Sequence, residues 1–119
     1  MDVDEGTDTR TALPFRVILR MEVRAELAQQ FEQVWLEVGA LIAEEPANLA
    51  QALVRSVEEQ GVYYVITDWR SKAQFHTFEH SAAHVEHRRR LKPFRTGGGM
   101  SLTEVVYQLP GAGAALARA

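Results

Sequence analysis

The sequence predicts a single small α+β domain in which strands and helices follow one another in the order β-α-β-β-α-β. Three observations support this. Apolar and polar residues alternate along parts of the chain, as they do in half-buried strands. Elsewhere apolar residues recur with the period of an α-helix, and prolines and glycines separate the two kinds of segment. A chain of 119 residues is long enough for one domain with a modest core.

The first strand and the first helix are predicted from a change of period. Between residues 15 and 23 every second residue is apolar, which places five side chains on one face of a sheet: Phe15, Val17, Leu19, Met21 and Val23. From Leu27 to Ile42 the apolar residues instead form one stripe of an amphipathic helix. We expect this helix to end before Pro46, because proline disfavours helical geometry in the residue before it.

A hairpin is predicted next. The second strand is expected from about Asn48 to Val57, and a third from Val62 to Trp69, which is rich in β-branched and aromatic residues. The polar segment 58–61 between them ends in glycine, as hairpin loops often do.

The rest of the domain is predicted from capping residues and turn signals. Ser71, followed three residues later by Gln74, is typical of a capping box that opens a helix. Ser81 is a candidate cap for a second helical segment that runs to about Lys92, ahead of Pro93. The glycines at 97–99 are interpreted as a flexible connection, because no strand-to-helix turn surrounds them as a phosphate-binding loop requires. The last strand is then expected from about Met100 to Leu109.

These elements divide the chain into residues 1–13, an aperiodic and disordered lead, residues 14–109, the folded domain, and residues 110–119, a flexible tail rich in glycine and alanine. The order corresponds to a ferredoxin-like fold, a four-stranded antiparallel sheet with helices on one face. The second face of such a sheet needs cover. We therefore expect a homodimer in which two sheets meet.

Composition excludes several classes of function. Zero cysteines exclude disulfides, thiol nucleophiles and thiolate metal sites. A formal net charge of −3 argues against a nucleic-acid partner, which would normally require a basic face. No apolar run approaches the roughly 20 residues that span a bilayer, so no membrane partner is expected. The acidic, polar start is unlike a targeting segment, which makes the cytoplasm the expected location.

Four histidines form the first candidate site. His76, His80, His84 and His87 would share one face of an unbroken helix. Histidines four residues apart can share a metal ion, but no acidic pattern completes such a site, and a helix break at Ser81 would divide the group. We therefore predict no metal site and interpret the histidines as a solvated or pocket-rim face, on which one of them could transfer a proton.

A basic run and a tryptophan are the other candidates. The run from His87 through Arg90, continued by Lys92 and Arg95, could bind a phosphate, a carboxylate or a phenolate, or could be a solvated helix end. Trp69 ends the third strand and shares one strand face with Tyr63, Val65 and Thr67. Its indole could form the wall of a pocket for a flat ligand and offer its N–H as a donor, or it could belong to the core.

The sequence resembles a family at two places. The run 64–69, Tyr-Val-Ile-Thr-Asp-Trp, is similar to the third strand of the antibiotic biosynthesis monooxygenase superfamily, with its terminal tryptophan. The stretch 73–84 resembles the family's helix, its break at a serine and the histidine that follows. The similarity covers roughly residues 15–109 and is greatest to members that accompany aromatic polyketide synthases. The resemblance implies a dimeric α/β barrel and oxidation of an anthrone-like polycyclic phenol by molecular oxygen, with no flavin, haem or metal cofactor.

The resemblance also assigns roles to residues. Trp69 would hold the ring system, and His84, His87 or Arg88 would stabilise the anion or move the proton. The expected substrate-binding residues are Asn48, Tyr63, Val65, Thr67, Phe78 and Arg90. In the quinone-forming members an asparagine lies four residues before the tryptophan; here that residue is Val65, and Asn48 is the candidate replacement.

Two other functions stay open at this point. The first is a polyketide cyclase of the same pathway, which needs acid–base groups but no oxygen. The second is a non-catalytic protein that binds the intermediate for another enzyme. Haem degradation is disfavoured, because residues 15–23 lack the first-strand asparagine of the haem-degrading relatives.

Overall fold

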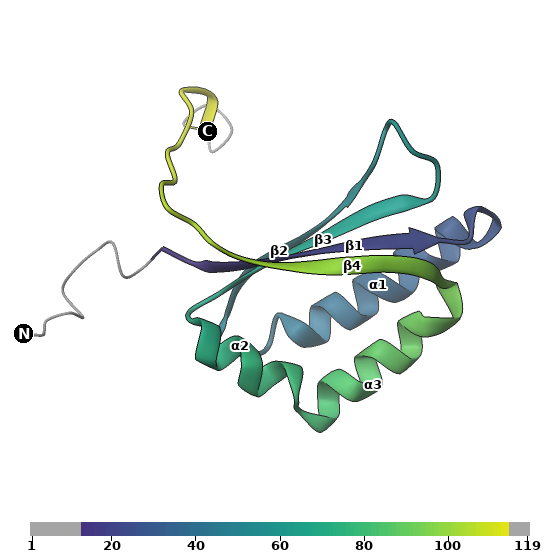
Figure 1. Ribbon diagram of the computed structural model, residues 1–119, viewed down its shortest axis with the longest axis horizontal. Helices are drawn as coiled ribbons and strands as arrows, with labels where there is room; N and C mark the ends of the chain where they lie inside the picture. The colour runs from purple at the N-terminus through teal and green to yellow at the C-terminus, as the bar shows by residue number, and fades with distance from the viewer. Residues whose placement is uncertain (1–12, 115–119) are drawn as a thin grey trace, which may run out of the picture.

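The computed structural model describes residues 13–114, so residues 1–12 of the lead predicted at 1–13, and residues 115–119 of the predicted tail, lie outside the described part. The main elements, labelled as in Figure 1, are β1 (Phe15–Val23), α1 (Ala28–Ile42), β2 (Asn48–Arg55), β3 (Val62–Trp69), α2 (Lys72–Glu79), α3 (Ala82–Leu91) and β4 (Arg95–Glu104). Short 3₁₀ turns precede α1 at Ala25–Leu27 and β4 at Lys92–Phe94. The order confirms the predicted ferredoxin-like class, with the second helix in two pieces.

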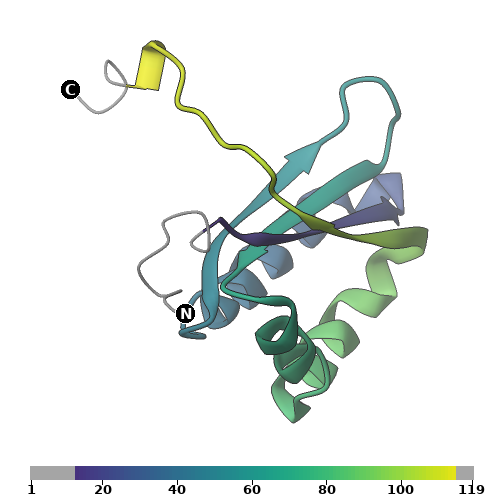
Figure 2. The same ribbon diagram turned by 60° about the vertical axis from the view of Figure 1, so that its left-hand side comes forward.

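The four strands form one antiparallel sheet in the spatial order β2-β3-β1-β4. Helices α1, α2 and α3 all lie on the same side of this sheet, as Figures 1 and 2 show. The register pairs Phe15 with Trp69 and Val17 with Thr67, so these four side chains share the helix-covered face. Within the described residues no helix is both long enough and apolar enough to cross a membrane.

Helix α1 forms where the apolar stripe predicts it. Phe31 and Val38 face the sheet and are 0% and 1% exposed, whereas Leu36 points away and is 60% exposed. The helix ends at Ile42, earlier than Pro46 requires, and hydrogen-bonded turns from Ala43 N–H and Glu45 N–H connect it to β2.

Helices α2 and α3 are separate helices, because each has its own serine cap. The Ser71 hydroxyl accepts the Gln74 amide N–H at 3.1 Å, and the Ser81 hydroxyl accepts the His84 amide N–H at 3.2 Å. A capping side chain satisfies amides that have no partner inside the helix. The break at Ser81 also means that the four histidines do not form one helical stripe.

The prediction for the last strand was wrong. Gly97, Gly98 and Gly99 belong to β4, where they pair with Glu22, Met21 and Arg20, and the strand ends at Glu104 rather than Leu109. Glycine lacks a strand propensity, but here β1 supplies the pairing partner. Gly98 has a φ of +144°, and a Cβ at this position would lie 2.0 Å from the Arg20 carbonyl oxygen. Only glycine fits this close approach between β1 and β4.

The helix-covered side contains two groups of buried side chains. The first, here called the tryptophan cluster, consists of Phe15, Val17, Trp69, Phe75 and Phe78. The second, the tyrosine cluster, consists of Met21, Val23, Phe31, Tyr63 and Val65. On the uncovered side of the sheet the register gathers Ile18, Tyr64 and Ile66, beside an ion pair between Arg16 and Asp68 at 2.7 Å.

Candidate active site

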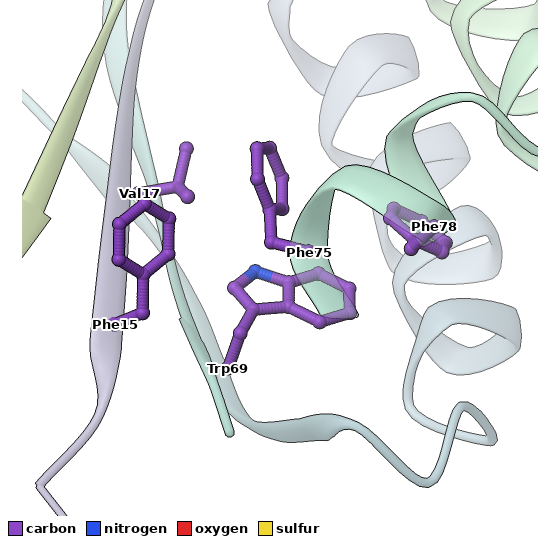
Figure 3. Close-up of a cluster of buried hydrophobic side chains, with 5 residues drawn as sticks. All are labelled: Phe15, Val17, Trp69, Phe75 and Phe78. Atoms are coloured by element: carbon purple, nitrogen blue, oxygen red, sulfur yellow. The ribbon is translucent and has the colours of Figure 1, made fainter. Parts of the chain in front are cut away.

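Among residues 13–114, Trp69 is the largest fully buried side chain, with an exposed fraction of 1%. Its indole packs against the rings of Phe75 and Phe78, with centroid distances of 5.5 and 4.7 Å (Figure 3). The indole N–H donates to the Thr67 hydroxyl at 2.8 Å. The tryptophan is therefore part of the core, and its donor is already used, so an aromatic ligand would have to displace Phe75 or Phe78 to stack on it.

Phe78 connects the tryptophan cluster to the histidines of α3. The ring centroid of His84 lies 4.6 Å from that of Phe78, and the ring of His87 lies 6.2 Å from it. The two imidazoles meet edge to face at 6.0 Å. Trp69, Phe78, His84 and His87 thus form one continuous series of rings from β3 to α3. The sequence prediction named all four, although it could not show that they touch.

Both histidines carry a buried polar atom without a partner. Within the described part of the chain, neither His84 Nδ1 nor His87 Nδ1 has a hydrogen-bond partner. Burial and the nearby Arg88 guanidinium lower the pKa of His84 to about 4. Burial and Arg90 also lower the pKa of His87. Both imidazoles are therefore neutral at neutral pH, and each ring can still accept or donate one hydrogen bond.

The arginines of α3 fall into two groups. Arg90 forms an ion pair with Glu37 of α1, and Arg89 forms one with Glu86 at 2.7 Å. The pair of Arg90 and Glu37 joins α3 to α1, whereas the pair of Arg89 and Glu86 lies within α3, and both guanidinium groups are occupied. Arg88, in contrast, has no acidic partner among residues 13–114 and lies beside a pocket of about 280 Å³. Of the two arginines predicted to act on a ligand, Arg88 is thus available, and Arg90 would first have to leave Glu37.

The predicted strand residues are divided between the two clusters. Thr67 holds the indole N–H of Trp69, and Asn48 lies opposite Trp69 at the start of β2. The Asn48 side-chain amide donates to the carbonyl oxygens of Ala50 and Asp68, both at 3.2 Å. Its N–H donors therefore hold the end of the hairpin together, and only its side-chain oxygen is left for other contacts.

Tyr63 and Val65 lie in the tyrosine cluster, toward the other end of β3. The Tyr63 hydroxyl donates to the Glu32 carboxylate, which also accepts from Arg55. Burial and that carboxylate raise the pKa of Tyr63. Tyr63 and Trp69 are six positions apart along β3, roughly 20 Å at about 3.3 Å per residue. The two residues therefore cannot contact the same small group of ligand atoms.

His76, on α2, and His80, which follows its last residue, lie on the Phe75 side of the cluster, with the His76 ring 5.7 Å from that of Phe75, and apart from His84 and His87. His76 Nδ1 lies 3.2 Å from the Glu79 carboxylate, and His80 Nδ1 lies 2.8 Å from the His76 carbonyl oxygen. Within residues 13–114 no three His, Cys, Asp or Glu side chains converge closely enough to hold a metal ion.

Phe75 was not among the site residues expected from the sequence, and Arg95 was named there only as part of the basic run. The ring of Phe75 packs against Trp69 at a tilt of 59°, and its i, i+3 spacing from Phe78 was the available signal. In the structure Arg95 begins β4, with its Nε buried and without a partner among the described residues.

The antiparallel sheet, its order and the single helical layer define a ferredoxin-like α+β protein. Solved structures share this fold. SnoaB from Streptomyces nogalater, described as a cofactor-independent oxygenase, matches in a mutant form with a TM-score of 0.73 and 22% identity, over 84% of this chain and 100% of that chain. A protein of Caulobacter crescentus CB15 assigned to the antibiotic biosynthesis monooxygenases matches with a TM-score of 0.72 and 23% identity, over 86% of this chain and 98% of that one.

The family follows from the sequence itself. The model of the family described as antibiotic biosynthesis monooxygenase matches residues 14–90, which is more than half of the chain. The protein therefore belongs to the antibiotic biosynthesis monooxygenase family. Among curated proteins no sequence matches it significantly.

Proposed function

We propose that the protein is a cofactor-independent monooxygenase that oxidises a polycyclic, anthrone-like phenol in aromatic polyketide antibiotic biosynthesis. The observation that carries this proposal is the series of rings from Trp69 through Phe78 to His84 and His87, which ends in two neutral imidazoles with unpaired Nδ1 atoms. Flat apolar walls beside a neutral proton acceptor suit a planar phenol that must lose a proton. The family membership and the fold shared with a cofactor-independent oxygenase support it.

The reaction needs little from the protein beyond binding and proton transfer. An anthrone methylene loses a proton, and the resulting anion passes electrons to O₂. The carbon is oxidised by four electrons to a carbonyl, and O₂ supplies the carbonyl oxygen and one water. His84 would take the proton, and the nearby positive charge of Arg88 would favour the anion. Exclusion of water would limit side reactions of the anion.

We further infer that the protein acts as a homodimer. The sheet face opposite the helices gathers Ile18, Tyr64 and Ile66 at its centre, and Val54 beside them is 40% exposed. A second copy would cover this apolar face, flanked by the ion pair of Arg16 and Asp68. Sedimentation equilibrium of the full chain measures the mass of the assembly, and we expect twice the mass of one chain.

The decisive experiment compares an anthrone-like phenol incubated with the protein under air and under argon. We expect quinone absorbance to rise under air only, with protein freed of metal by a chelator and colourless in the visible range. Product formed equally fast without protein would contradict the proposal, because the phenol would then oxidise unaided.

Trp69→Phe tests the ring series. We expect turnover to fall at least about tenfold, because the indole sets the position of Phe78 and the imidazoles, while unfolding free energy falls by only about 1–3 kcal/mol. The matched control is Trp35→Phe, which changes the second tryptophan of the protein. Trp35 lies on α1, and its replacement should leave turnover within about twofold. Equal loss of turnover in both variants would mean that Trp69 has a structural role only.

A polyketide cyclase is the second candidate, and Val65 favours it. This residue is 9% exposed and lies in the tyrosine cluster, where it offers no hydrogen bond to polarise a substrate oxygen. Ring closure and dehydration of an open-chain poly-β-ketone by the protein under argon, without quinone formation in air, would establish the cyclase. Binding without either reaction would indicate a protein that holds the intermediate for another enzyme.

A further inference from the structure

A basic pocket lies at the end of the sheet away from Trp69. It has a volume of about 280 Å³ and is lined by Met21, Arg88, Leu91, Lys92 and Arg95. Met21 is 1% exposed and supplies an apolar floor together with Leu91. Three cationic side chains thus surround an apolar surface at the junction of β1, α3 and β4.

The positive charge of this pocket is not neutralised within the described chain. Among residues 13–114, Arg88, Lys92 and Arg95 have no acidic partner, whereas their neighbours Arg89 and Arg90 are paired with Glu86 and Glu37. Cations near a helix C-terminus are common on solvated surfaces, which accounts for Arg88 and Lys92. It does not account for Arg95, which begins a strand and whose Nε is buried without a hydrogen-bond partner. An arginine donor withdrawn from water without an acceptor is costly.

The glycines of β4 create the space that Arg95 uses. Gly98 pairs with Met21, so its missing side chain would lie on the helix-covered face above the apolar floor. The Arg95 guanidinium lies 3.0 Å from the point where a Gly98 Cβ would be. A glycine here therefore lets the Arg95 guanidinium pack close to the backbone of β4.

An apolar strip continues from the pocket along β4. Met100 and Leu102 pair with Leu19 and Val17, so their side chains point to the helix side, yet they are 48% and 43% exposed. Gly98 and Leu102 are four residues apart, roughly 13 Å at about 3.3 Å per residue. At the far end of the strip, Val17 belongs to the tryptophan cluster.

We propose that Arg88, Lys92 and Arg95 bind the carboxylate of a ligand whose flat apolar body lies over Met21 and along Met100 and Leu102. Guanidinium groups match carboxylates with paired N–H donors, and the apolar floor favours an organic acid over a small hydrated anion. This site goes beyond the proposed oxidation. It recognises a carboxylate, which takes no part in that reaction, and it would also bind aromatic acids that cannot be oxidised.

Calorimetric titration of the full-length protein tests the site with three probes: 2-naphthoate, the neutral 2-naphthalenemethanol and inorganic phosphate. We expect 2-naphthoate to bind about tenfold more tightly than either of the others. Equal affinity for naphthoate and the alcohol would overturn the role of the cations. Phosphate binding as tightly as naphthoate would overturn the role of the apolar floor, and absence of naphthoate binding would overturn the site.

Variants locate the binding. Arg95→Met keeps an apolar stem and should raise the Kd of 2-naphthoate about tenfold, and the exposed Arg88→Gln and Lys92→Met should each raise it by about threefold. Arg89→Gln removes the same charge from α3 outside the pocket, and we expect it to change the Kd less than twofold. Equal weakening by Arg89→Gln would mean that net charge alone attracts the acid. If Arg95→Met fails to fold, the Kd values of Lys92→Met and Arg88→Gln still test whether the acid binds in this pocket.

Discussion

The tyrosine cluster and the tryptophan cluster are built on the same face of the same sheet but treat their polar groups differently. At the α1 end, the Tyr63 hydroxyl donates to Glu32, and Arg55 donates to the same carboxylate at 3.0 Å. At the α2–α3 end, His84 and His87 border the cluster with Nδ1 atoms that no described residue contacts. The Tyr63 hydroxyl thus has a hydrogen-bond partner, whereas the His84 and His87 Nδ1 atoms have none among the described residues.

This difference separates stability from function. A buried polar group that is satisfied strengthens the fold, and one that is not weakens it. Two imidazoles whose Nδ1 atoms have no partner among the described residues, beside Phe78, are therefore a local cost that a bound ligand could offset. We expect substitutions at the α1 end to change mainly the unfolding free energy, and substitutions at the histidines to change mainly binding and pH dependence.

The largest expected effect is that of Phe31→Ala. Phe31 is fully buried, and its ring lies 4.9 Å from that of Tyr63 and 6.1 Å from that of Phe94. Removal of such a ring typically lowers the unfolding free energy by about 3–5 kcal/mol. Urea denaturation measures it, and the exposed Leu36→Ala on the same helix should change it by less than about 0.5 kcal/mol. A loss below about 1 kcal/mol would contradict the assignment of stability to this cluster.

The second effect is a loss of stability in acid. His84 has a pKa of about 4 in the folded protein and near its ordinary 6.5 in the unfolded chain. Below pH 6.5 the unfolded chain therefore binds a proton that the folded protein does not, so stability is full above pH 6.5 and falls as the pH approaches 4. The loss is at most about 3 kcal/mol, and smaller because water reaches part of the ring.

His84→Gln should remove most of that pH dependence, as measured by urea denaturation at pH 7, 6, 5 and 4.5. His80→Gln is the control, since His80 is exposed and should leave the wild-type pH profile unchanged. If both variants retain the wild-type slope, His84 is not held neutral by its surroundings.

The smallest of the three effects is that of Tyr63→Phe. This change removes the hydroxyl that donates to Glu32 but leaves the Arg55 pair in place. We expect a loss of about 1–2 kcal/mol in unfolding free energy, typical of a hydrogen bond to a charged group, and an unchanged affinity for an anthrone-like ligand. Weakened ligand binding would show that the two clusters are not independent.

Much of the fold could be predicted because local pattern and tertiary contacts agree. The alternation of residues 15–23, the stripe around Phe31 and the serine caps at 71 and 81 each specify their element from neighbouring residues alone. Strand β4 could not be predicted in this way. Its first half contains Gly97, Gly98 and Gly99, which have no intrinsic preference for a strand and are extended because β1 pairs with them.

The site was predictable in its residue types but not in its geometry. The sequence named Trp69 and Phe78 as candidate site residues, and the structure brings their rings to 4.7 Å. Spacing could not show that the indole N–H is taken by Thr67 or that Arg90 is held by Glu37, because these partners are set by contacts between elements. Spacing likewise could not show that Arg88 and Arg95 have no acidic partner among the described residues, while Arg89 and Arg90 do.

The break at Ser81 has a consequence for access to the interior. It leaves α3 as a short helix in which only His87 is buried, next to α1 with three buried residues. Helices of ten residues do not persist in water without packing, and segments with few buried contacts open most readily while the rest of a protein stays folded. We expect α3 to be the part that detaches first, so that a wide, flat molecule reaches the rings beneath it through transient opening rather than through a permanent channel.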